Sequence, residues 1–102
     1  MLNTEFKKEN GELLVILEGS LDTLTAGDFD KKLTEALSDD VQRIIMDVKD
    51  VQYISSAGLR TILAAQQRME DDDLDGVLVI NANEIVRDIF SVTGFDKLVD
   101  ME

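Results

Sequence analysis

The sequence predicts a single α/β domain built on a mostly parallel β-sheet. The chain has 102 residues, which is close to the usual size of one domain. Hydrophobic residues make up 44% of it, which is enough to form a core. Short apolar runs of strand length alternate with segments in which apolar residues recur at helical spacing. This alternation is typical of βαβ units.

The first half of the chain contains two predicted strands and one helix. Residues 13–17 form an apolar run after a turn at Asn10-Gly11, and we expect a strand there. Residues 22–25 are rich in helix-capping side chains, and residues 26–37 have helical spacing, so a helix follows. A second, buried strand is predicted over residues 44–48, with residues 51–54 as its extension beyond a kink.

The second half repeats the alternation. We expect a helix from Ser56 to about Met69, a turn over residues 70–76, and a buried strand over residues 77–80. A third helix follows, which Asn81 or Asn83 would cap and Gly94 would end, and then a short strand over residues 97–99. Continuous apolar strands indicate a sheet covered on both faces, or on one face with a partner on the other.

The composition excludes several kinds of chemistry. The chain contains no Cys and no His, so thiol catalysis, disulfides, zinc sites, haem ligation and His-based triads are excluded. We expect no catalytic residues, no cofactor and no metal site. The acidic run over residues 71–76 matches the first half of a calcium loop, but Ala82 stands where that loop needs Glu. We interpret the run as a solvated turn.

The charge of the chain limits its partners. The formal net charge is −12, which argues against binding to nucleic acid or to an anionic membrane surface. No apolar run approaches the ~20 residues needed to span a bilayer, and residues 1–10 do not resemble a secretory signal. We therefore expect a cytoplasmic protein, not inserted in a membrane, whose partner carries a basic patch.

The strand–helix junction (residues 53–60) has the least ordinary composition. Ser55 and Ser56 follow the predicted strand, and Ala57 and Gly58 open the next helix. Free backbone N–H groups and the dipole at a helix start favour an anion, so a phosphoryl group on a serine here would be stabilised. The alternative is purely structural, with one serine as the N-cap and Gly58 relieving crowding.

Four segments resemble STAS domains, and more narrowly the bacterial anti-sigma-factor antagonists. The main one runs from residue 44 to Leu59 and includes the junction. The others are residues 17–26, 77–80 and 86–95, and together the four cover roughly residues 5–100 in the expected order. The resemblance implies a small mixed, mostly parallel sheet with helices packed on one side. The chain stops at Glu102, where many family members add a final helix, so that helix is expected to be absent or truncated.

The resemblance also implies a partner-switching function rather than catalysis. In such systems the unphosphorylated antagonist binds an anti-sigma factor and frees the sigma factor. The anti-sigma factor is also a serine kinase that phosphorylates the antagonist, and a serine phosphatase reverses this. The site implied here comprises Asp22, Thr23, Leu24, Ser55, Ser56, Ala57, Gly58, Leu59 and Arg60.

The acceptor serine is the point at which the chain departs from the family. The family has its phosphoacceptor directly before Gly-Leu, and here that position is Ala57. Three interpretations stay open: Ser56 is the acceptor, the chain binds constitutively without phosphorylation, or it is a STAS subunit of an ABC-type lipid transport complex. The last group can carry a hydroxyl-Ala-Gly-Leu version of the turn. We favour Ser56 over Ser55 as the acceptor.

Several nearby side chains have two interpretations each. Asp22 and Thr23 match a loop that contacts the kinase in the family, but they also suit helix capping. Arg60 could face a partner or a phosphate, or be a solvated charge. Leu24, Tyr53 and Phe95 are expected to pack in the core, with an exposed anchor for a partner as the alternative for Leu24 and Phe95.

Overall fold

A computed structural model describes residues 1–102 as five β-strands, three α-helices and one 3-10 helix. The strands are β1 (Leu2–Glu9), β2 (Glu12–Leu21), β3 (Arg43–Ile54), β4 (Gly76–Ile80) and β5 (Asp100–Met101). The helices are α1 (Ala26–Ala36), α2 (Ser56–Asp71), α3 (Glu84–Thr93) and the 3-10 helix η1 (Phe95–Lys97). None of the helices has the length and apolar character that crossing a membrane requires.

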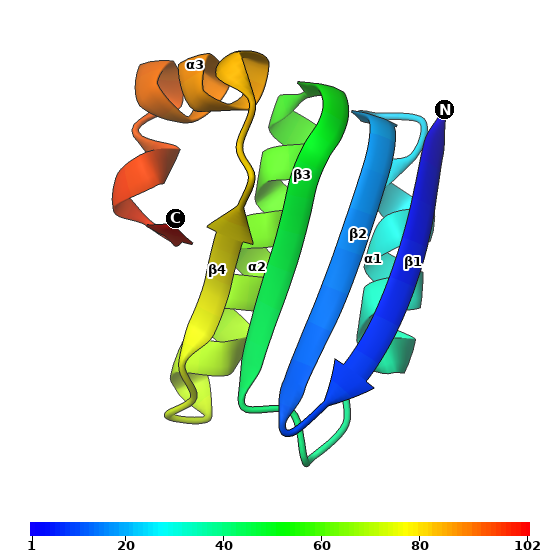
Figure 1. Cartoon of the computed structure of the whole chain (residues 1–102), viewed down its shortest axis with the longest axis vertical. Helices are drawn as coiled ribbons and strands as arrows, with labels where there is room; N and C mark the ends of the chain where they lie inside the picture. The colour runs from blue at the N-terminus through cyan, green and yellow to red at the C-terminus, as the bar shows by residue number, and fades with distance from the viewer.

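The strands form one mixed sheet in the order β1-β2-β3-β4-β5. β1 pairs with β2 in the antiparallel direction, and all other neighbours are parallel. Helices α1 and α2 lie behind the sheet in the view of Figure 1, and α3 lies beyond the end of the sheet at which β3 stops. The predicted fold class, a small mixed and mostly parallel sheet with helices on one side, is confirmed.

The core lies between the sheet and its helices. Buried side chains alternate along β2 and β3, as expected for strands with one covered face, and they contribute to a cluster of 24 buried residues. On the opposite face, the aliphatic side chains are only half-buried, and no helix covers that face (Figure 1). Of the two arrangements that the strand pattern allowed, the structure has the one-sided one.

The sequence interpretation missed strand β1. This strand forms a hairpin with β2 through Asn10 and Gly11, whose φ angles of 52° and 81° are those of a turn with two left-handed residues. Phe6 points to the helix side and stacks on Phe29 of α1, with ring centroids 6.5 Å apart. Charged residues make up half of β1 and keep its mean hydropathy low, although the Asn-Gly pair was recognisable as a hairpin turn.

The last predicted strand, over residues 97–99, is wrong. Gly94 ends α3 in the left-handed region with φ 74°, and the chain then turns through η1. The reason is the burial of Phe95, whose ring packs 5.0 Å from that of Phe90. Only after this turn does the chain reach the edge of β4, where β5 pairs with it. α2 also continues to Asp71, so the acidic turn is shorter than predicted.

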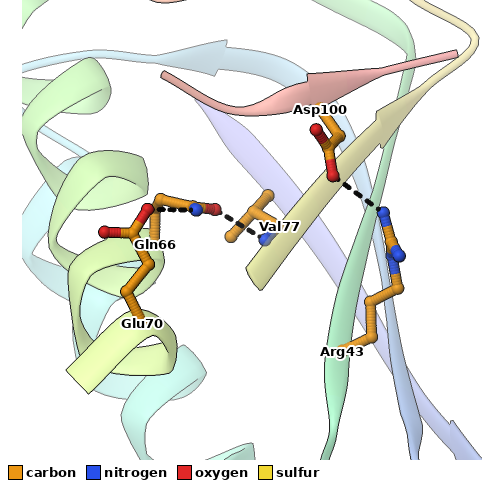
Figure 2. A network of polar contacts seen from close by, with 5 residues as sticks. All are labelled: Arg43, Gln66, Glu70, Val77 and Asp100. Atoms are coloured by element: carbon orange, nitrogen blue, oxygen red, sulfur yellow. Dashed lines mark hydrogen bonds and ion pairs between the residues drawn. The ribbon is translucent and has the colours of Figure 1, made fainter. Parts of the chain in front are cut away.

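Polar contacts connect the elements at the end of the sheet away from the junction (Figure 2). The Gln66 side chain of α2 accepts a hydrogen bond from the backbone N–H of Val77 at 2.7 Å and donates one to Glu70 at 2.7 Å. Arg43 of β3 forms an ion pair of 3.2 Å with Asp100 of β5. These contacts join α2 to β4 and β3 to β5 at this end of the sheet, and the candidate site lies at the opposite end.

Candidate partner-binding site

The candidate site lies where the parallel strands β2 and β3 end. Parallel strands end at the same edge of a sheet, so the loops that follow them lie side by side. The backbone N–H of Ser55 donates to the carbonyl of Leu21 at 2.9 Å, which joins the two strand ends directly. The structure therefore brings together the two predicted segments, residues 22–25 and residues 55–60.

Gly58 allows the close approach between these segments. A Cβ atom added at Gly58 would lie 2.6 Å from the carbonyl oxygen of Leu21 and 3.0 Å from Ile54 Cγ2. Gly58 and Leu59 are both buried. They were expected to contact a partner, but because they are buried, they support the site from below rather than form its surface.

The two serines have different environments. The Ser55 Oγ accepts a hydrogen bond from the backbone N–H of Gly58 at 3.3 Å, so Ser55 is the N-cap of α2. Ser56 is the first residue of the helix, is exposed, and forms no side-chain hydrogen bond with another protein group. Ser55 therefore has the helix-capping role, and the Ser56 hydroxyl is exposed and free of any hydrogen bond within the chain.

The loop before α1 has a rigid base and an exposed tip. The Asp22 carboxylate accepts hydrogen bonds from the backbone N–H groups of Leu24 and Thr25, at 2.9 and 3.2 Å. The Thr25 hydroxyl donates to the carbonyl of Ser20 at 2.9 Å. Thr23 and Leu24 are left exposed at the tip, and the Leu24 side chain is 91% exposed. Leu24 is thus not a core residue.

The remaining predicted residues lie at the margin of the site. Ala57 is half-buried and cannot carry a phosphate. Arg60 is exposed and forms no ion pair within the chain. Its guanidinium is free to meet a group from outside.

The structure adds a groove that sequence reasoning missed. It has a volume of about 340 Å³ and separates the end of β3 and the start of α2 from α3. We call it the α3 groove, and its lining residues are Tyr53, Ile54, Ser56, Asp88, Ile89, Val92 and Thr93. Tyr53 was expected in the core but is 51% exposed, whereas Phe95 is buried as expected.

The side chain of Asn83 joins α3 to the sheet. The Asn83 side chain caps α3 by accepting from the backbone N–H of Val86 at 3.0 Å. Its amide nitrogen lies 2.8–3.3 Å from three carbonyl oxygens of β3, those of Val48, Lys49 and Val51. Of the two Asn residues predicted as caps, Asn83 has this role.

Comparison with known proteins identifies the family. The sequence matches the STAS domain over residues 3–102. The chain belongs to the STAS domain family. Among curated STAS relatives, BtrV of Bordetella bronchiseptica, provisionally named an anti-sigma factor antagonist, is 29% identical over 86% of this chain and 75% of its own. RsfB of Mycobacterium tuberculosis, named an anti-sigma-F factor antagonist, is 23% identical over 86% of this chain and 70% of its own.

Solved structures share the fold of this STAS domain. An anti-sigma factor antagonist from Mycobacterium paratuberculosis superposes with a TM-score of 0.82 at 20% identity, covering 99% of this chain and 85% of the other. The unphosphorylated form of the anti-sigma factor antagonist SpoIIAA gives 0.81 at 18% identity, over 98% of this chain and 88% of the other. The phosphorylated form of SpoIIAA from Bacillus gives 0.74 at 17% identity, over 98% and 91%. At these identities the likeness supports the fold alone.

Proposed function

We propose that this STAS domain is a cytoplasmic anti-sigma factor antagonist that acts by binding and is controlled by phosphorylation of Ser56. It would bind an anti-sigma factor with serine kinase activity, release the sigma factor, and be reset by a serine phosphatase. The proposed contact surface comprises Asp22, Thr23, Leu24, Ser55, Ser56, Ala57 and Arg60, with Gly58 and Leu59 buried beneath it. The phosphoryl chemistry would belong to the partners, because the site presents a hydroxyl to be modified and no catalytic constellation.

The observation that carries the proposal is that Ser55 caps α2, whereas the Ser56 hydroxyl is exposed and has no hydrogen-bond partner in the chain. Ser55 already caps α2 through the N–H of Gly58, so α2 does not depend on the Ser56 hydroxyl for its start. Ser56 is exposed at the first position of a 16-residue helix. A phosphate on Ser56 would add a charge of about −1.5 to −2 at the helix N-terminus, where the dipole favours it. The names of the relatives support the choice of partner.

Such a phosphate would act against binding through charge. The chain already carries a formal net charge of −12, so a partner that fits it must bring positive charge or tolerate strong negative charge. An additional dianion inside the contact surface must be desolvated when the partner binds, unless a cation meets it. Phosphorylation is therefore expected to release the anti-sigma factor.

Mass spectrometry of the phosphorylated chain tests the acceptor. The purified chain would be incubated with ATP and each purified anti-sigma factor from its own genome, and the phosphorylated peptide would be fragmented. Phosphate on Ser56, lost in Ser56→Ala and kept in Ser55→Ala, supports the proposal. Phosphate on Ser55 would refute the assignment of the acceptor. Binding of Ser56→Asp as tight as that of the unmodified chain would remove Ser56 from the mechanism.

A second candidate function rests on Ala57, which occupies the usual acceptor position. Under this second candidate function, the domain is a constitutive STAS binding module or a non-catalytic STAS subunit of an ABC-type lipid transport complex. In that case no phosphate appears, Ser56→Asp has little effect, and a bulky residue at Ala57 disrupts assembly with an ATPase. Co-purification with an ATPase, compared between Ser56→Asp and Ala57→Leu, separates the two functions.

A further inference from the structure

One flank of α3 exposes apolar side chains beside those that the helix buries. Val86 and Phe90 fill the core from the inner side. On this flank, Ile85, Ile89 and Val92 follow one another at spacings of four and three residues, so they lie in one row. Ile89 is half-buried and packs against the core, whereas Ile85 and Val92 are exposed. Val92 is 87% exposed. The apolar surface of α3 is therefore wider than the part that packs on its own domain.

The row leads into the α3 groove and to Ser56. Ile89 and Val92 form one wall of the groove, and Tyr53 and Ile54 lie on the β3 side. Ser56, the proposed phosphoacceptor, lines the same groove. The apolar surface is thus continuous with the proposed contact surface at the start of α2.

The α3 groove has one uncompensated charge. Asp88 lines it and forms no ion pair in the chain. The neighbouring Arg87 directs its Nε away, to the carbonyl of Ala82 at 2.9 Å. No Lys or Arg lines the groove, so a carboxylate next to an apolar wall has no cation to neutralise it. This arrangement favours a positively charged group from a partner.

We infer that the α3 groove receives an apolar side chain of the anti-sigma factor, and that a Lys or Arg beside it faces Asp88. The inference rests on the proposed function and adds α3 to its contact surface. A phosphate on Ser56 would place a second negative charge in the groove, where the partner's cation is already paired with Asp88, and would hinder entry of the apolar side chain. The groove would thus contribute affinity and also make the affinity sensitive to phosphorylation.

Binding measurements on single variants test the apolar contact. The probe is each purified anti-sigma factor from the same genome, titrated calorimetrically with the full chain. Val92→Ser is expected to weaken binding about tenfold, as loss of one buried aliphatic side chain predicts. The matched control is Leu98→Ser, an aliphatic residue 48% exposed and outside the groove, with an expected change within about twofold. Melting temperatures of both variants check that the fold is intact.

Charge variants test the role of Asp88. Asp88→Asn is expected to weaken binding about threefold at low salt and less at high salt, while the exposed Asp96→Asn changes it little. The loss caused by Ser56→Asp is expected to be smaller in the Asp88→Asn background, because the partner's cation, no longer paired with Asp88, can then face the carboxylate at position 56. A purely structural role for Asp88 would not produce this coupling.

Three outcomes would overturn the inference. If Ser56→Asp abolishes binding while Val92→Ser and Asp88→Asn bind as the unmodified chain does, the proposed function stands and the groove has no part in it. If Leu98→Ser weakens binding as much as Val92→Ser, the effect is not specific to the groove. If no anti-sigma factor of the genome binds the unmodified chain, the proposed function and the groove partner both fail.

Discussion

Replacement of Gly58 by alanine tests whether the close approach of α2 and β2 holds the site in place. The added Cβ would lie 2.6 Å from the Leu21 carbonyl oxygen, 2.8 Å from Leu21 Cγ and 3.0 Å from Ile54 Cγ2. The carbonyl cannot move freely, because it accepts the hydrogen bond from the Ser55 N–H at 2.9 Å. The helix or the strand end must therefore shift.

The expected loss of stability in Gly58→Ala is the difference between two opposing effects. Overpacking of a tight site costs about 1–3 kcal/mol, and alanine gains about 1 kcal/mol over glycine inside a helix. Because the 2.6 Å contact is with a backbone oxygen, the overpacking cost is taken from the upper part of its range, about 2–3 kcal/mol. The net result for Gly58→Ala is a free energy of unfolding lower by about 1–2 kcal/mol, or a melting temperature lower by about 4–10 °C. Binding of the anti-sigma factor should weaken as well, since the shift moves Ser55 and Ser56.

Urea denaturation followed by circular dichroism measures the effect, with Gly27→Ala as the matched control. Gly27 lies in α1 with no atom within 4 Å of its added Cβ, so alanine there should raise the free energy of unfolding by about 0.5–1 kcal/mol. If the free energy of unfolding has the same slope against urea concentration in the variants and in the unmodified chain, the unfolded state is unchanged. If Gly58→Ala is as stable as the unmodified chain, or gains stability as Gly27→Ala does, the reasoning about this contact is refuted.

Three further predictions concern caps and one carboxylate. Ser55→Ala should lower the free energy of unfolding by about 1 kcal/mol through loss of the α2 cap. In the same urea experiment, Ser56→Ala should leave the free energy of unfolding within about 0.5 kcal/mol of that of the unmodified chain. Asn83→Ala should cost about 2–4 kcal/mol, because it removes the α3 cap and leaves β3 carbonyls without a donor; a urea midpoint close to that of the unmodified chain would contradict this. The Ser38 hydroxyl donates to the exposed Asp40 carboxylate and holds its pKa below the ordinary value of 3.8, so Ser38→Ala should raise that pKa in an NMR titration. Since the folded-state pKa is the lower one, the small stabilisation is present above about pH 4 and lost as the pH falls through the folded-state pKa.

Much of the fold was predictable because most strands and helices have a recognisable pattern within their own stretch of sequence. Each of β2, β3 and β4 contains one continuous apolar run, and α1 and α2 each show apolar residues at helical spacing within one segment. β1 was missed because half of its residues are charged, as an edge strand permits, and only the Asn10-Gly11 turn marks it. The C-terminal strand was displaced because its position depends on where Phe95 packs, which is a tertiary contact with Phe90.

The candidate site was predictable only in part, for a similar reason. Ser55 and Ser56 could be placed at a helix start from sequence, but which of them caps the helix depends on backbone geometry that the residue types leave open. The α3 groove could not be predicted, because Tyr53 and Val92 come from elements separated in the chain and meet only through the fold. Its sequence mark, an i, i+4, i+7 row on α3, is the same pattern that a buried helix face produces.

The hydrogen bonds of Asn83 have a consequence for the kinetics of recognition. One side chain caps α3 and contacts three carbonyl oxygens of β3, so α3 and the strand that leads to Ser56 form one rigid unit. A partner would therefore meet a preorganised surface and would not have to wait for a rearrangement. Association should proceed in a single concentration-dependent phase whose rate constant falls with ionic strength, and phosphorylation should act mainly on how long the complex lasts.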